Sequence, residues 1–270
     1  MNASLPARRK SAPERRVRLL IPALSVAFLL GCREAPVRLN EPVEPSRTAP
    51  PDDRILRHVY ARFVRIDGRV DYAGIAIEPG AVEEYLDQVA ATDVAALTPE
   101  QRTAFWINAY NALFLRAVSL WHPLVSTRRF PAIDRRVLLH VGAEPLSLAA
   151  IRERKLLDGG DPRILFALRT GSRSGPDAGR EPLKAAGLDA ELRRRTREFL
   201  MDSSRNELDP SDGVLELSRL FDRYRDVFGS SREGLLEFIA TQRPGLRDAL
   251  RRRDLVVRWK PWDERLDEAR

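Results

Sequence analysis

The feature that most constrains the fold is a long, largely apolar segment near the middle of the chain, TPEQRTAFWINAYNALFLRAVSLW, at residues 98–121. Thr98 followed by Pro99 is a typical helix start, because the threonine can cap the first turn and proline fits the first helical position. Pro123 ends the pattern. The segment therefore predicts one long helix with a strongly apolar side.

Two amide side chains lie on the apolar side of this predicted helix. At about 100° per residue, Asn108 and Asn111 share an arc with Ile107 and Leu115. A buried amide left without a hydrogen-bond partner costs roughly 1–3 kcal/mol, so each must find one. The favoured interpretation is structural, with both amides bonded to the backbone of a neighbouring loop. The alternative is a ligand-binding role, in which they hold a substrate carbonyl or amide.

Shorter elements complete the pattern. Helical spacing predicts further helices at residues 54–65, 81–92, 148–157, 188–202 and 232–242. Extended chain is predicted at residues 67–75, in a hairpin around Gly142, and at 163–168, 213–218 and 254–262. Because helices outnumber strands and do not alternate with them regularly, we expect an α+β fold: a single compact domain, helix-rich, with a small mixed or antiparallel sheet.

The N-terminus predicts export and lipid attachment. A basic stretch precedes an apolar run at residues 19–31, which is shorter than the roughly 20 residues of a transmembrane helix and fits a signal peptide. The run ends in LLGC, where Cys32 is the only cysteine of the chain. This ending resembles the bacterial lipoprotein signal, which implies that Cys32 is acylated, with palmitate-type chains, and becomes the mature N-terminus. An uncleaved signal anchor is the alternative.

Three parts follow from this reading. We expect a signal peptide at residues 1–31, a proline-rich tether at 32–53, and a folded domain at 54–270. The expected location is the cell envelope, with the membrane contacted through the lipid. Arg33, rather than an aspartate, follows the cysteine, so we expect the periplasmic face of the outer membrane if the bacterium has two membranes.

The charge distribution argues against a nucleic-acid partner. The chain carries a net charge of +7, but residues 1–31 hold six basic residues and one acidic residue. Removal of that segment leaves a nearly neutral protein, whereas nucleic-acid binding needs a basic surface. The expected partners are instead an envelope protein or a cell-wall component.

The long central helix also carries a family resemblance. Its run FWINAYNAL, at residues 105–113, resembles the signature of a bacterial and plant family called domain of unknown function 547. Weaker similarity extends over roughly residues 55–265, and the family name implies no activity. Trp106 and Tyr110 of this run are most simply core aromatics with a polar edge.

The chain departs from this family at several polar positions. Members commonly carry a Glu-His pair where this chain has Arg152 and Glu153, and a histidine where it has Leu165. They commonly carry cysteines where it has Thr170 and Gly175. A zinc site needs three or four ligands and a thiol hydrolase needs a thiolate beside a base. With its one cysteine in the lipid anchor, the chain is expected to use no metal or cofactor and to bind rather than catalyse.

The loop in RILFALRTGSRSGPDAG, residues 163–179, holds the remaining candidates. Its glycines together with Arg169 and Arg173 could hold an anion, and Ser172 and Ser174 are further candidate ligand-binding residues. The alternative function is a hydrolase that uses either serine of the loop at 171–176 with His140 as base. GSRSG lacks the Gly-x-Ser-x-Gly order of a nucleophile elbow, which favours binding.

The C-terminal segment WKPWDERLD, residues 259–267, carries two tryptophans on either side of Pro261. We expect it to pack as a strap against the domain, with an exposed aromatic binding edge as the alternative.

Overall fold

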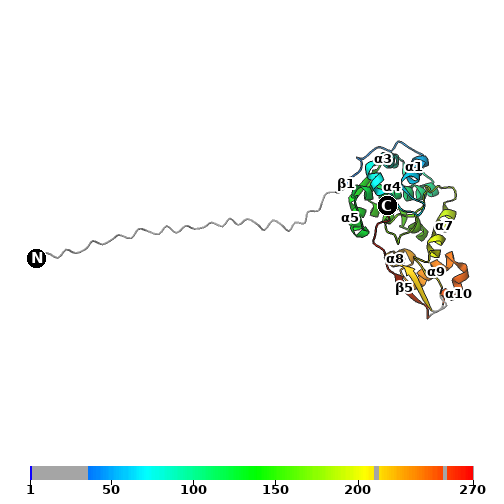
Figure 1. Cartoon of the computed structure of the whole chain (residues 1–270). Helices are drawn as coiled ribbons and strands as arrows, with labels where there is room; N and C mark the ends of the chain where they lie inside the picture. The colour runs from blue at the N-terminus through cyan, green and yellow to red at the C-terminus, as the bar shows by residue number, and fades with distance from the viewer. Residues whose placement is uncertain (2–35, 210–212, 252–253, 270) are drawn as a thin grey trace. The chain divides into compact units, whose positions relative to one another are not determined.

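The computed structural model describes residue 1 and residues 36–209, 213–251 and 254–269. Cys32 and the predicted signal peptide lie outside the described residues. The chain from Pro36 onward forms one compact unit of helices with two small sheets (Figure 1). Among the described helices, none combines the length and apolar composition that crossing a bilayer requires.

Helix α4 (Pro99–Leu120) lies at the centre of the larger hydrophobic core and confirms the predicted long helix. The Thr98 side chain accepts from the Gln101 N–H, and the Gln101 side chain accepts from the Thr98 N–H, which forms a capping box. Nearly every residue from Ala104 to Ser119 is buried. A helix buried on all sides must satisfy its polar side chains internally, which determines how Asn108 and Asn111 are used.

Three helices precede α4 in the sequence: α1 (Asp53–Phe63), α2 (Tyr72–Ile77) and α3 (Gly80–Ala90). Helices α2 and α3 pack against α4, and α1 packs against α3. Helix α1 begins after the cap Asp52 and covers most of the helix predicted at residues 54–65. The extended chain predicted for residues 67–75 is wrong in its second half. Asp71 accepts from the Gly74 N–H at 2.7 Å, and this cap starts α2 where the sequence pattern is too short to show a helical period.

The predicted hairpin is present and gains a third strand. Strands β2 (Val137–Val141) and β3 (Glu144–Leu146) pair antiparallel across Gly142, whose φ of +59° suits glycine. Strand β1 (Val37–Arg38) pairs parallel with β2. The sheet is therefore mixed.

The predicted tether boundary is wrong for residues 36–53. Asn40 exchanges two hydrogen bonds with the His140 backbone, at 2.8 and 3.0 Å, and Ser46 donates its N–H to the Ala91 carbonyl at 2.8 Å. Proline prevents regular structure here but leaves other backbone groups free to bond the domain. The compact unit begins at Pro36 rather than at residue 54.

A second, smaller core forms around β4 (Val214–Ser218) and β5 (Val256–Lys260), which pair in parallel. The helices of this part are α7 (Leu188–Met201), α8 (Arg219–Arg223), α9 (Arg232–Gln242) and α10 (Arg247–Leu250), with short 3₁₀ helices η5 (Arg225–Phe228) and η6 (Pro244–Leu246). Phenylalanine rings fill its centre: neighbouring rings of Phe166, Phe199, Phe221, Phe228 and Phe238 have centroids 4.9 to 6.4 Å apart. The α+β class expected from the sequence is confirmed.

The strand predicted at residues 163–168 is wrong. The segment forms a 3₁₀ helix, η4 (Pro162–Ala167), which begins where Asp161 accepts from the Arg163 N–H at 2.9 Å. Its apolar run is continuous because both cores use it: Ile164 belongs to the larger core and Phe166 to the smaller one. A short apolar run of this kind does not distinguish a strand from a buried helical turn.

The C-terminal residues 261–269, called the strap below, run across the loop that follows η4. Asp267 donates its N–H to the Gly171 carbonyl at 2.8 Å and accepts from the Val70 N–H at 2.9 Å. Leu266 is buried and donates its N–H to the Val125 carbonyl at 3.2 Å. The strap thus joins three segments that are far apart in the sequence.

Candidate functional site

The two amides of α4 clamp backbone rather than face a pocket. Asn108 donates to the Leu183 carbonyl at 2.8 Å and accepts from the Leu183 N–H at 2.9 Å. Asn111 donates to the Ala167 carbonyl at 2.8 Å and accepts from the Arg169 N–H at 2.9 Å. Both side chains are buried, so the structural interpretation accounts for them. They fix the end of η4 and the chain that leads into α7.

The serines of the loop are bonded to the strap. Ser172 donates its hydroxyl to the Asp263 carbonyl at 2.7 Å, and Ser174 accepts from the Asp263 N–H at 2.8 Å. His140 Nδ1 lies 3.0 Å from the Asn40 carbonyl oxygen. In the described ranges, no hydrogen bond joins either serine to an imidazole.

The arginines of the loop are also engaged in holding it. Arg169 is buried, donates to the Gly179 carbonyl at 2.8 Å and places its guanidinium 5.1 Å from the Tyr60 ring centroid. Arg173 donates to the Leu266 carbonyl at 3.3 Å. The structure therefore does not bring the six residues singled out by the sequence together around an open site.

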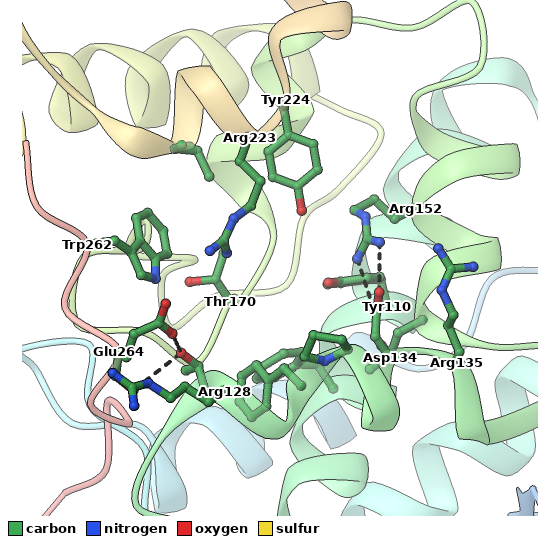
Figure 2. A pocket seen from close by; sticks show the side chains of 16 residues that line it. Tyr110, Arg128, Asp134, Arg135, Arg152, Thr170, Arg223, Tyr224, Trp262 and Glu264 are labelled. Carbon is green, nitrogen blue, oxygen red and sulfur yellow. Dashed lines mark hydrogen bonds and ion pairs between the residues drawn. The ribbon is translucent and has the colours of Figure 1, made fainter. Parts of the chain in front are cut away.

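A pocket of about 570 Å³ lies beside this loop instead (Figure 2). Its walls come from α4, η2 (Thr127–Arg129), α5 (Phe130–Arg136), α6 (Leu148–Ala150), the π-helix η3 (Ile151–Leu156), α8 and the strap. Aromatic and charged side chains line it: Tyr110, Phe114, Phe130, Tyr224, Trp262, Arg128, Asp134, Arg135, Arg152, Arg223 and Glu264. The pocket thus lies where elements of both cores meet.

Arg152 is the central cation of one wall. It donates to both carboxylate oxygens of Asp134, at 2.9 and 2.8 Å, and its guanidinium lies 5.9 Å from the Tyr224 ring centroid. Burial lowers the pKa of Arg152, but the hydrogen bonds to Asp134 and the charge interactions with neighbouring acidic groups together outweigh it, and the pKa is raised. The side chain arises from η3, where Leu157 donates its N–H to the Arg152 carbonyl at 3.0 Å. Such π-turns are frequent at functional sites.

Two tyrosine hydroxyls accompany this ion pair. Burial raises the pKa of Tyr110, and burial likewise raises the pKa of Tyr224. Both phenols therefore keep their protons at neutral pH and remain available as donors. The Tyr224 hydroxyl points into the pocket (Figure 2).

The opposite wall carries a cation and two further polar groups. The Arg223 guanidinium lies 4.7 Å from the Trp262 ring centroid and has no carboxylate partner among the described residues. The buried Trp262 Nε1 has no hydrogen-bond partner in the described part of the chain. Thr170 also lines the pocket, while the Glu264 carboxylate accepts from the Thr127 hydroxyl.

Two positions where the chain departs from the resembled family meet in this pocket, namely Arg152 and Thr170. Leu165 lies in the smaller core, and a Cβ at Gly175 would collide with the Thr170 hydroxyl. Sequence reasoning missed the pocket itself, including Asp134, Arg223 and Tyr224. The sequence signal that could have indicated the pocket is the departure from the family pattern at residues 152 and 170. Residues that differ together from a family pattern can share a site.

The described residues offer few metal ligands here. No three His, Cys, Asp or Glu side chains within the described ranges lie close enough together to hold a metal ion. The pocket instead offers hydrogen-bond donors and aromatic faces, which suit an organic ligand.

Comparison with known proteins gives one match. Residues 94–200 match the model of a family described as "Protein of unknown function, DUF547". This segment contains α4, η3, η4 and the loop that carries Thr170, so the similar part includes two sides of the pocket. No curated protein and no solved structure matches the chain.

The Arg152–Asp134 pair generates a first prediction. The two side chains are only 11% and 21% exposed, so Asp134→Asn removes the two-oxygen carboxylate partner of a largely buried guanidinium. We expect the free energy of unfolding to fall by about 1–3 kcal/mol, measured by urea denaturation. The control is Glu153→Gln, which removes a half-exposed carboxylate 3.3 Å from Arg152 and should cost less than about 0.5 kcal/mol. Equal losses in the two variants would contradict the assignment.

The Asn108 clamp generates a second prediction. Asn108→Ala leaves the Leu183 N–H and carbonyl buried without partners, so we expect a loss of about 2–4 kcal/mol in the free energy of unfolding. Thr103→Ala on the exposed side of the same helix should change it by less than about 0.5 kcal/mol. A loss below about 1 kcal/mol for Asn108→Ala would show that the clamp does not hold the chain before α7.

Proposed function

We propose that this protein is a lipid-anchored binding domain of a bacterial cell envelope, which takes a small ligand into the pocket between Arg152 and Trp262 and does not transform it. The observation that carries the proposal is the state of the groups lining the pocket. The Arg223 guanidinium and Trp262 Nε1 make no hydrogen bond to a described residue. Both carboxylates of the lining, in contrast, are already bonded. Such unfilled donors are typical of a binding site.

The alternative of a serine hydrolase gains no support from the contacts. Each loop serine is hydrogen-bonded to the strap, and His140 Nδ1 is at the Asn40 carbonyl. A nucleophile and its base must lie within hydrogen-bond reach of each other. The serines are better explained as groups that fasten the strap, and the strap in turn supplies Trp262 to the pocket wall.

The proposed anchor is Cys32. Its support is the sequence pattern at residues 19–32. The compact unit begins at Pro36, so the connection from Cys32 spans at most about 14 Å of extended chain. A lipid on Cys32 would therefore hold the domain directly at the membrane surface, without a long spacer.

Anchoring is tested by Cys32→Ala. We expect the variant to lose labelling with a clickable palmitate analogue and to leave the detergent phase on phase separation, because the acylated thiol is gone. Arg33→Lys, one residue further on, is the control and should keep both properties. Membrane fractionation of Cys32→Ala without label would instead identify residues 19–31 as an uncleaved signal anchor.

Use of the pocket is tested by fluorine NMR on the full chain in detergent with 5-fluorotryptophan. The chain has four tryptophans, and Trp262→Phe assigns the signal of the pocket residue. We expect ring-sized organic compounds, charged and neutral, to include some that move the Trp262 signal while the signal of Trp121, outside the pocket lining, stays in place. If no compound in the panel moves the Trp262 signal, or both signals move together, the proposed binding function is wrong.

A further inference from the structure

We propose that the ligand of this pocket carries an oxyanion, a carboxylate or a phosphate, on a flat apolar body of about ring size. The anion binds at Arg223, and the flat body lies against the aromatic side chains. This inference rests on the proposed function and adds the chemical class of the ligand to it.

Arg223 is held in place and keeps its N–H groups open to a ligand. Its guanidinium stacks on the Trp262 indole at 4.7 Å and has no carboxylate partner in the described part of the chain. Stacking against one face holds the guanidinium plane in place while its N–H edge remains open. An Arg held this way offers the planar fork of donors that fits a carboxylate or phosphate with two parallel hydrogen bonds.

The other polar groups considered in the pocket are also hydrogen-bond donors. Trp262 Nε1 can only donate, and it is buried without a partner among the described residues. The Tyr224 phenol keeps its proton and points into the pocket, and the Thr170 hydroxyl is a further donor in the lining (Figure 2). A site that presents donors rather than acceptors is matched by a ligand with several acceptor atoms, as an oxyanion has.

The pocket lining carries more positive than negative charge. The described lining contains four arginines and two carboxylates. Asp134 is bound on both oxygens by Arg152, and Glu264 accepts from Thr127. Glu153, just outside the lining, lies 3.6 Å from Arg135 and 3.3 Å from Arg152. With Glu153 counted, one positive charge remains in excess, which favours an anion over a neutral or cationic ligand.

Aromatic rings form an apolar part of the pocket wall. Phe114 and Phe130 meet edge to face with centroids 5.4 Å apart, and Pro131, Leu148 and Leu220 add further apolar side chains to the lining. Gly171 allows this arrangement, because a Cβ there would collide with the Phe130 ring. Flat apolar groups pack against such faces, and a volume of about 570 Å³ accommodates a ring with a short substituent.

The test uses the full chain in detergent and a matched series of probes on one ring: benzoate, phenylphosphate, neutral benzamide and cationic benzylamine. Binding is followed by the Trp262 fluorine signal. We expect benzoate or phenylphosphate to bind at least about tenfold more tightly than benzamide, as one charge-assisted bidentate contact provides. Which of the two anions binds more tightly identifies the head group.

Arg223→Gln and Arg225→Gln separate the site from general charge. Arg223→Gln should weaken the anionic probe about tenfold and leave benzamide unchanged. Arg225→Gln makes the same change two residues later, at an exposed arginine that pairs with Asp222 outside the pocket lining, and should leave all affinities unchanged. Both side chains are at the surface, so near-UV circular dichroism should show an unaltered fold.

Several outcomes would overturn the inference. Benzamide or benzylamine binding as tightly as the anions would show that the pocket takes rings without regard to charge, which leaves the proposed binding function intact. Acetate or inorganic phosphate binding as tightly as the ring compounds would reduce the site to an adventitious ion only. Equal losses in Arg223→Gln and Arg225→Gln would exclude Arg223 as the anion contact. A Trp262 signal that no probe moves would overturn both the inference and the proposed function.

Discussion

The backbone hydrogen bonds of Asn108 and Asn111 are the interactions on which the arrangement of the site depends. Helix α4 is buried nearly all round, so its two amides must find partners inside the protein. They take both backbone groups of Leu183, the carbonyl of Ala167 and the N–H of Arg169. Four backbone groups, at the end of η4 and in the irregular chain after it, are thereby satisfied in the core.

The remaining contacts follow from this attachment. With the end of η4 held on α4, the loop after it is positioned to accept the strap, and Ser172 and Ser174 fasten Asp263 of the strap at both its backbone groups. Burial raises the pKa of Asp267 to about 6, and Tyr72 donates to this carboxyl at 2.9 Å. Trp262 precedes Asp263 in the strap, so the same contacts place its indole opposite the Arg152–Asp134 pair.

The sequence predicts those parts whose signals are local. Helix α4 has a cap, a period and a stop within its own residues, and the hairpin around Gly142 has its turn. Residues 163–168 and the segment at 36–53 are different, because their structure depends on partners far along the chain. The pocket is harder still to predict, since its charged side chains come from five separate elements. Only Arg152 and Thr170 gave a sign of it, as departures from a family pattern.

Both departures, at Arg152 and Thr170, place a hydrogen-bond donor where the resemblance implies an electron-pair donor. Where the resemblance leads one to expect an acid, this chain has the guanidinium of Arg152, which is bonded to Asp134 and stacked near Tyr224. Where it leads one to expect a thiol, the chain has the Thr170 hydroxyl, and the absence of a side chain at Gly175 gives that hydroxyl its space. A carboxylate and a thiolate donate electron pairs to a substrate or metal, whereas a guanidinium and a hydroxyl donate hydrogen bonds. In the proposed binding site, this replacement favours an anionic ligand over an electrophile.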